Sequence, residues 1–138
     1  MRNIRRIKYK NRQGVAAIEF AIVGPIFILL LIGMIVYGGW FWMAHSVQAA
    51  VSEGARAAVA GLDPAEQEQL ARDVIVAQLK DLGLKTADAV VAVQAGSGTL
   101  RVEVAYDAGG HPLMALSPLT ISPPHTIRRS AVIRVEEV

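Results

Sequence analysis

The sequence predicts an α+β protein: one long N-terminal transmembrane helix continues outside the membrane and leads to a small head with one helix and about three antiparallel strands. Three observations predict this fold: a long uncharged apolar stretch, a strong second helix start, and alternating apolar and polar residues near the C-terminus. The 138 residues suffice for one domain but not two. The expected parts are a basic cytoplasmic leader (residues 1–14), a transmembrane helix (15–44), a helix extension (45–61) and an extracytoplasmic head (62–138).

The apolar stretch carries no charged side chain from Phe20 to Ala44. About 20 apolar residues in a helix cross the hydrocarbon core of a bilayer, and a core helix of a small soluble domain is rarely apolar on every face for so long. The stretch ends in Trp40, Phe41 and Trp42, which suit the membrane–water interface. A secretory signal peptide is the alternative, with small residues for cleavage between Ala44 and Ala50, but its apolar stretch would be only about 7–15 residues long.

The charge distribution predicts the orientation of this helix. Before Val15 the chain has basic residues and no acid, and basic flanks stay on the cytoplasmic side. The head should therefore lie outside the cytoplasm. The remaining chain is acidic on balance, so the formal charge of +2 reflects the leader and gives little support to nucleic-acid binding. The leader's basic residues are Arg2, Arg5, Arg6, Lys8, Lys10 and Arg12.

The border between leader and apolar stretch contains the candidate functional residues. Gly14 has no side chain and leaves a helix readily, so a peptidase at the cytoplasmic face could cut after it and make Val15 the new N-terminus. Glu19, followed by Phe20, would then lie about one helical turn from a new amine. Intramembrane carboxylates are costly and usually have a partner, so Glu19 can pair with the amine of a neighbouring helix. The simpler interpretation is an N-cap glycine followed by an acid near a helix N-terminus.

The stretch Arg12-Gln13-Gly14-Val15-Ala16-Ala17-Ile18-Glu19-Phe20, with Pro25 shortly after, resembles the class III signal of type IV pilins and pseudopilins. More narrowly, it is similar to the TadE-like family of minor pseudopilins from tight-adherence (Flp-type) pilus systems. The small-residue run 54–58 and the closing segment 130–136 also resemble that family. One departure is Val36-Tyr37-Gly38, where members often carry a second acid.

The resemblance implies a structural subunit that assists assembly of a bacterial Tad/Flp-type pilus. A prepilin peptidase would cut after Gly14, and Glu19 and Phe20 would take part in subunit docking. The implied partners are membrane lipid, the prepilin peptidase, other pilin-like subunits and the assembly platform, without nucleic acid or a small-molecule substrate. The implied location is the bacterial inner membrane, with possible incorporation into a surface pilus. The alternative is an uncleaved single-pass envelope protein whose head binds a partner.

The remaining elements follow from local patterns. The helix should run from Val15 to Ala60, with a kink at Pro25, and its extension has an apolar stripe that packs on its own head or on another subunit. A second helix should start at Asp63-Pro64 and stop at Gly83. The stripe comprises Val47, Val51, Ala55, Ala58, Val59 and Leu62. The apolar side expected for the second helix comprises Leu70, Val74, Ala77, Leu79 and Leu82.

Strands are expected over 89–95 and 99–106, joined by Gly96-Ser97-Gly98, and a third over 127–136. Because Arg129 breaks its alternation, the third strand proper should begin near Ser130. The proline-containing segment 107–125 reads as a long loop that is either a variable part of the head or the part that faces a partner.

No motif indicates catalysis, so we expect no enzyme, cofactor or metal site. The histidines, His45, His111 and His125, are scattered, and the sequence has no cysteine. Ser97 lies in a Gly-Ser-Gly turn rather than in a nucleophile elbow.

Overall fold

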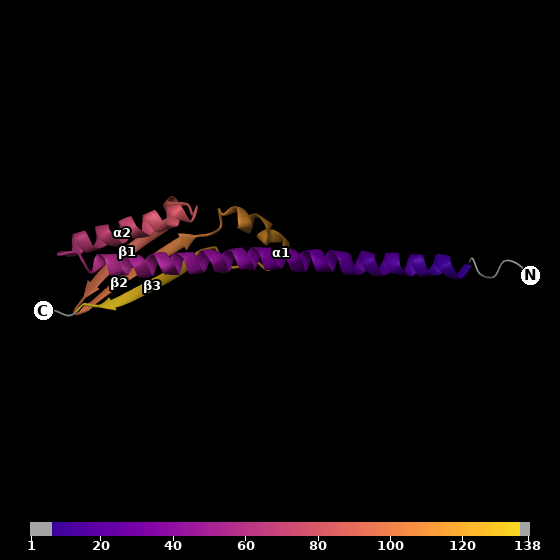
Figure 1. The fold of residues 1–138 in the computed structure, drawn as a ribbon, viewed down its shortest axis with the longest axis horizontal. Coiled ribbons are helices and arrows are strands. Elements are labelled where there is room, and N and C mark those ends of the chain that lie inside the picture. Colours follow the sequence, from indigo (N-terminus) through magenta and orange to yellow (C-terminus); the bar gives the residue numbers. More distant parts are fainter. Residues whose placement is uncertain (1–6, 136–138) are drawn as a thin grey trace, which may run out of the picture.

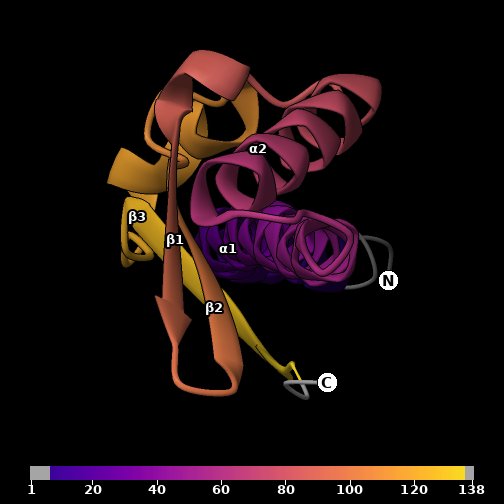
Figure 2. The same ribbon diagram turned by 90° about the vertical axis from the view of Figure 1, so that its left-hand side faces the viewer.

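The computed structural model describes residues 7–135, and it describes side chains from Gly14 onward. Residues 1–6 of the predicted leader therefore lie outside the described residues, as do Glu136 and the two residues after it. A long helix extends beyond a small head in which helices cover one face of a three-stranded sheet (Figures 1 and 2), which confirms the predicted α+β fold. The elements are α1 (Ile7–Ala58), α2 (Pro64–Asp81), η1 (Thr86–Asp88), β1 (Ala89–Gly96), β2 (Thr99–Asp107), η2 (Pro112–Leu119) and β3 (Thr126–Arg134).

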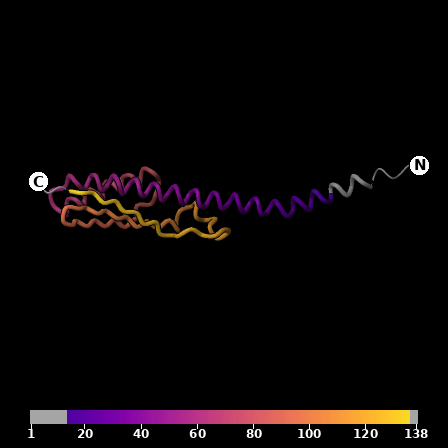
Figure 3. The backbone as a smooth tube through the Cα atoms, turned by 90° about the horizontal axis from the view of Figure 1, so that it is seen from below, coloured from indigo at the N-terminus to yellow at the C-terminus, as the bar shows by residue number. Residues whose placement is uncertain are grey.

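Helix α1 begins earlier than expected, at Ile7, and it ends at Ala58, close to the predicted Ala60. It continues through Pro25 as one helix (Figure 3), although a proline has no N–H to bond the carbonyl of the preceding turn. The second half of α1 lies along the head, whereas the first half projects away from it (Figures 1 and 3).

Helix α2 has the predicted caps. The backbone N–H of Glu66 donates to Asp63 Oδ1 at 2.8 Å, and Glu66 Oε2 accepts from the N–H of Leu62 at 2.7 Å. At the other end, Gly83 has a φ of 73°, a left-handed conformation that favours glycine. The N–H of Leu84 bonds the carbonyl of Leu79 at 2.9 Å, which closes the last turn. These contacts satisfy backbone groups that a helix end otherwise leaves unpaired.

The sheet is an antiparallel meander in the order β1-β2-β3, with β2 in the centre. In β2, Leu100, Val102, Val104 and Tyr106 point to the buried face, as the alternation predicts. Val104 lies between Val91 of β1 and Arg129 of β3 in the strand register. The buried face packs on the two helices, and α1 lies over β2 and β3 while α2 approaches β1.

The apolar stripe of α1 packs on its own head, which decides between the two partners considered for it. Val47, Val51, Ala55 and Ala58 are fully buried in the core. The stripe does not continue further, because the helix ends at Ala58: Val59 is 43% exposed and Leu62 is 94% exposed.

The apolar side predicted for α2 is largely wrong. The buried residues are Ala71, Ile75 and Leu79, and of these only Leu79 was expected. Ala71 and Ile75 lie against Gly54 of α1, since a Cβ built on Gly54 would be 2.6 Å from Ile75 Cγ1 and 2.9 Å from the Ala71 carbonyl oxygen. The two helices thus approach closely at Gly54, which leaves room for Ala71 and Ile75, and the half-buried Leu70 and Val74 lie to the side of this contact.

The third strand begins at Thr126, so the predicted start near Ser130 is wrong. Arg129 shares the inner face with Ile127 and Ala131, and it is half-buried. It is tolerated because β3 is an edge strand and a long arginine can reach solvent there; its guanidinium donates to the carbonyl of Arg128 at 2.9 Å. The expected long loop is partly ordered as η2, which packs against α1.

We predict that Gly54→Ala destabilises the head. Overpacking typically costs about 1–3 kcal/mol, and here one clash is with a backbone carbonyl that no side-chain rotation relieves. Gly38→Ala is the matched control, because Gly38 is an exposed glycine of the same helix with no atom within 4 Å of a built Cβ. Alanine should stabilise the helix there by up to about 1 kcal/mol. Thermal unfolding of the head in detergent, followed by near-ultraviolet circular dichroism, measures both variants. Equal midpoints would contradict the close approach.

Candidate functional site

The candidate site is the part of α1 that projects from the head. We call Val15–Leu31 the free segment; its residues are exposed, apart from the half-exposed Gly24. Large apolar side chains cover it on every side, and Glu19 is its one charged residue. Within the described residues, α1 from Gly14 onward is the helix long and apolar enough to cross a membrane. A fully apolar surface of this kind is stable against lipid or other apolar helices but not against water.

Gly14 and Val15 lie inside α1 rather than at its start. The helix already includes seven residues before Gly14, so the N-cap interpretation of this glycine is wrong. No atom lies within 4 Å of a built Cβ on Gly14, and Val15 is 56% exposed. Unwinding the helix here breaks no side-chain packing in the described structure. The cost is limited to local backbone hydrogen bonds, and glycine lowers it by about 1 kcal/mol relative to alanine.

Glu19 and Phe20 lie just inside the free segment. Glu19 is exposed and lies about 6 Å further along the axis than Val15, which is one turn of helix. Phe20 is 77% exposed, and its ring lies over Gly24, where a built Cβ would be 3.8 Å from two ring carbons. The carboxylate and the aromatic ring are therefore both exposed and available to a neighbour.

The head first meets α1 at Ile32, which packs at the edge of the core, and Val36 is the first fully buried residue of the helix. Part of the predicted span 15–44 is thus covered by protein. The cover includes η2 and the segment after it: Leu113 lies on Gly39, and Trp40 Nε1 donates to the carbonyl of Pro124 at 2.8 Å. The sequence offered no signal for this cover, because it comes from residues far later in the chain, 84 positions in the case of Trp40 and Pro124.

Among the side chains that the structure describes, the other polar groups form no second site. His111 Nδ1 accepts from the N–H of Leu113 at 3.3 Å, and His45 and His125 are exposed on separate elements. In the part of the chain that the structure describes, no three metal-ligating side chains gather. Burial raises the pKa of Tyr106, with a further contribution from the Asp88 carboxylate, so this hydroxyl stays neutral in the core.

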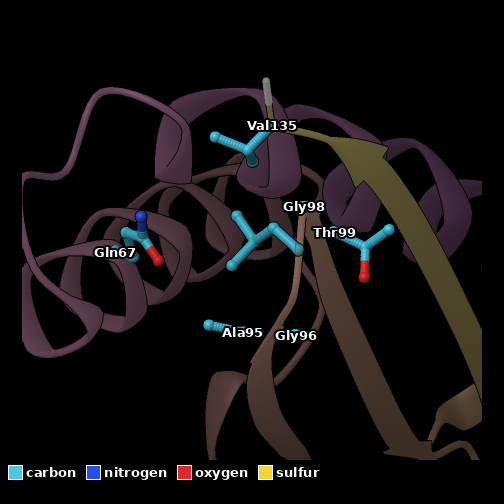
Figure 4. A pocket seen from close by; sticks show the side chains of 7 residues that line it. Gln67, Ala95, Gly96, Gly98, Thr99 and Val135 are labelled. Atoms are coloured by element: carbon cyan, nitrogen blue, oxygen red, sulfur yellow. The ribbon is translucent and has the colours of Figure 1, made fainter. Parts of the chain in front are cut away.

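A small cavity of about 120 Å³ opens beside the β1–β2 turn (Figure 4). Gln67, Leu100 and Val135 line it together with residues of the turn, and none of its lining side chains is charged. Binding sites for small molecules usually measure about 300–1,000 Å³. The cavity is therefore too small for a substrate site.

The comparison with protein families bears directly on the free segment. Residues 14–56 match the TadE-like protein family. The TadE-like match begins at Gly14, includes the free segment and ends within the buried half of α1, and it covers about a third of the chain. No curated protein and no solved structure matches the chain. The match relates the chain to Tad pilus proteins, and together with the spanning helix it indicates a membrane-anchored protein.

The TadE-like region therefore coincides with α1 and stops short of the rest of the head. It contains all four predicted site residues, Gly14, Val15, Glu19 and Phe20. It also contains Gly54, the point of closest approach to α2, which sequence reasoning had noted only as part of a small-residue run.

Proposed function

We propose that the chain is a pseudopilin-like structural subunit, without enzymatic activity, that assists assembly of a Tad/Flp-type pilus. A prepilin peptidase would mature it by cutting after Gly14, and its partners would be other pilin-like subunits and the assembly platform. The observation that carries the proposal is the free segment: it matches the TadE-like family and is apolar on every side except at Glu19, one turn from Val15.

Cleavage requires an extended backbone in the active site of the peptidase. The helix around Gly14 would unwind locally, which glycine and the lack of packing make inexpensive. Val15 would then carry a positively charged amine at the membrane surface. The same cut would remove the leader and its six basic residues, which hold this end on the cytoplasmic side before cleavage.

Glu19 would then serve in assembly. A charged side chain at the centre of a bilayer costs about 2.5–3.5 kcal/mol on insertion scales, and less near the surface. Pairing with the amine of Val15 on a neighbouring subunit would offset that cost and set the axial register of the two helices. Phe20 would pack beside the pair and exclude water, and the remaining apolar surface of the free segment would pack against further helices.

The competing function is an uncleaved single-pass envelope protein whose head binds a partner. One observation favours it: α1 runs without interruption from Ile7 through Gly14. The burial of Ala44 and Ala50 within α1 argues against cleavage by an ordinary signal peptidase between these residues. Cutting there would remove part of the helix on which the head packs.

We predict that the head lies outside the cytoplasm. The chain has no cysteine, so a single Leu62→Cys, at a side chain that is 94% exposed, reports its own compartment. A membrane-impermeant maleimide should label it in spheroplasts before lysis. Asn3→Cys in the uncleaved protein is the matched control and should be labelled only after lysis. The reverse pattern would overturn the orientation.

We predict that the mature chain begins at Val15 when a prepilin peptidase is present, and that Gly14→Val abolishes processing. Valine adds a bulky side chain at the point where glycine leaves the backbone unhindered for the peptidase. Val15→Ile is the control, since it enlarges the side chain on the other side of the bond by one methylene and leaves Gly14 unchanged. N-terminal sequencing or intact mass decides between the outcomes. A chain that keeps Met1–Gly14 favours the competing function, and a chain that starts near Ala44–Ala50 contradicts both.

We predict that Glu19→Gln is processed and inserted normally but associates poorly with other subunits. Breaking one side of a desolvated ion pair costs about 3–5 kcal/mol, or roughly two to three decades in association. Crosslinking from Ile18→Cys, a neighbouring side chain that is 63% exposed, measures the association, with pilus counts alongside.

The matched control for this charge is Glu53→Gln, also on α1. Glu53 pairs with Arg56 at 3.0 Å, and because both side chains are exposed, the pair contributes little. Crosslinking of this variant should equal that of the parent protein. If Glu19→Gln also equals the parent, Glu19 has no docking role.

A further inference from the structure

The segment from Ala108 to Ile127, which contains η2, carries no aspartate, glutamate, lysine or arginine. It is apolar and includes three large side chains that face away from the core: Leu116 is 39% exposed, Leu119 is 56% exposed and Ile121 is 85% exposed. Such residues in a surface loop of a soluble head would be in contact with water. We call residues 108–125 the base loop.

The base loop is fixed at the end of the head that is nearest to the free segment. Figures 1 and 3 both show it as the part of the head that extends furthest toward the N-terminal half of α1. The bond from Trp40 to the carbonyl of Pro124 and the contact of Leu113 with Gly39 hold it at that level. Trp42 lies beside the His111 ring, with 6.2 Å between the ring centroids. The position of the loop along the axis of α1 is therefore determined by specific contacts.

The length of the free segment relates this level to the membrane. Val15–Leu31 spans roughly 25 Å at about 1.5 Å per residue, whereas the hydrocarbon core is about 30 Å thick. A bilayer that begins near Val15 thus extends to about Ile35, while the head already meets the helix at Ile32. Trp40, Phe41 and Trp42 follow at the height where aromatic side chains favour the interface. The end of the head that is nearest to the free segment therefore reaches the edge of the membrane.

We propose that the base loop is a second membrane contact, in which Leu116, Leu119 and Ile121 insert into the lipid interface on the side of the head. The occupant is lipid rather than protein, because the loop packs against the spanning helix beside Gly39 and Trp40, at the level of the interfacial aromatic residues. The loop has no aspartate, glutamate, lysine or arginine, so insertion does not carry the cost of desolvating such a charge. The proposal requires that α1 spans the membrane, but it does not depend on cleavage or on pilus assembly.

The chemistry of the loop also indicates which lipids it contacts. Interfacial binding depends on buried apolar area and on attraction between basic residues and anionic lipids. The base loop has no lysine or arginine, so only the apolar contribution remains. Contact should therefore be equally strong with zwitterionic and anionic bilayers.

The test uses the full chain, labelled at one cysteine with an environment-sensitive fluorophore. The labelled variants are Leu119→Cys and Ile121→Cys, with Leu62→Cys as the matched control: it is also an exposed aliphatic side chain, but it follows α1 at the opposite end of the head. Each is reconstituted at low density in phosphatidylcholine vesicles, with and without anionic phosphatidylglycerol. We expect a blue shift at positions 119 and 121 and a loss of emission when lipids spin-labelled near the headgroup are added. Position 62 should show neither.

A second variant separates insertion from mere proximity. Ile121→Asp, with the label at position 119, should reduce the quenching by lipid, because a carboxylate opposes burial in the interface. Leu62→Asp should leave it unchanged. Quenching at 119 and 121 equal to that at 62, or quenching that Ile121→Asp does not alter, would overturn the proposal. So would efficient crosslinking of position 121 to a second copy without lipid quenching, since that result indicates a protein contact.

Discussion

Burial of one side of the second half of α1 holds the head together. Helix α2, η2, β2 and β3 all pack on this helix, and β1 is held by α2 and by its pairing with β2. The buried residues recur every three or four positions from Val36 to Ala58, and many of them are small. Small residues let α2 and the sheet approach closely, so that a short chain buries a continuous core around a single helix. Nearer its N-terminus, in the free segment, the same helix carries apolar side chains on every side and the head does not cover it.

The sequence predicted the elements better than it predicted how they face one another. The caps of α2 are local, so Asp63, Glu66 and Gly83 could be recognised from spacing alone. The buried face of α2 depends on which part of α1 it meets, and the partner there is Gly54, which has no hydropathy signal. The apolar pattern therefore predicted burial of large side chains such as Val74, whereas Ala71 and Ile75 are the ones buried beside Gly54. The start of β3 was predicted too late for a similar reason. An arginine on the inner face at position 129 is tolerated because β3 is an edge strand, and this depends on the arrangement of the sheet.

The candidate site was accessible from sequence for a physical reason. The surface of a segment that contacts lipid does not depend on tertiary packing. The basic leader, the glycine, the glutamate and the apolar stretch can therefore be recognised directly in the sequence. Where that segment ends could not be read. The end is set by the head, which first meets α1 at Ile32 and includes a loop distant in sequence that contacts Gly39 and Trp40. The start of the helix was also placed too late, since the polar residues from Ile7 onward continue the same helix.

The continuity of α1 has a mechanical consequence. Between Pro25 and Ala58 the helix has neither a break nor a second proline, and its latter half is the central support of the head. A pull or twist applied to the helix between Pro25 and the head therefore passes along a chain of backbone hydrogen bonds directly into the core. The compliant point is Pro25, where one bond is absent and the helix is uncovered. The part of α1 that follows Pro25 thus behaves with the head as one rigid lever, and bending is concentrated at the proline within the free segment rather than where the helix meets the head.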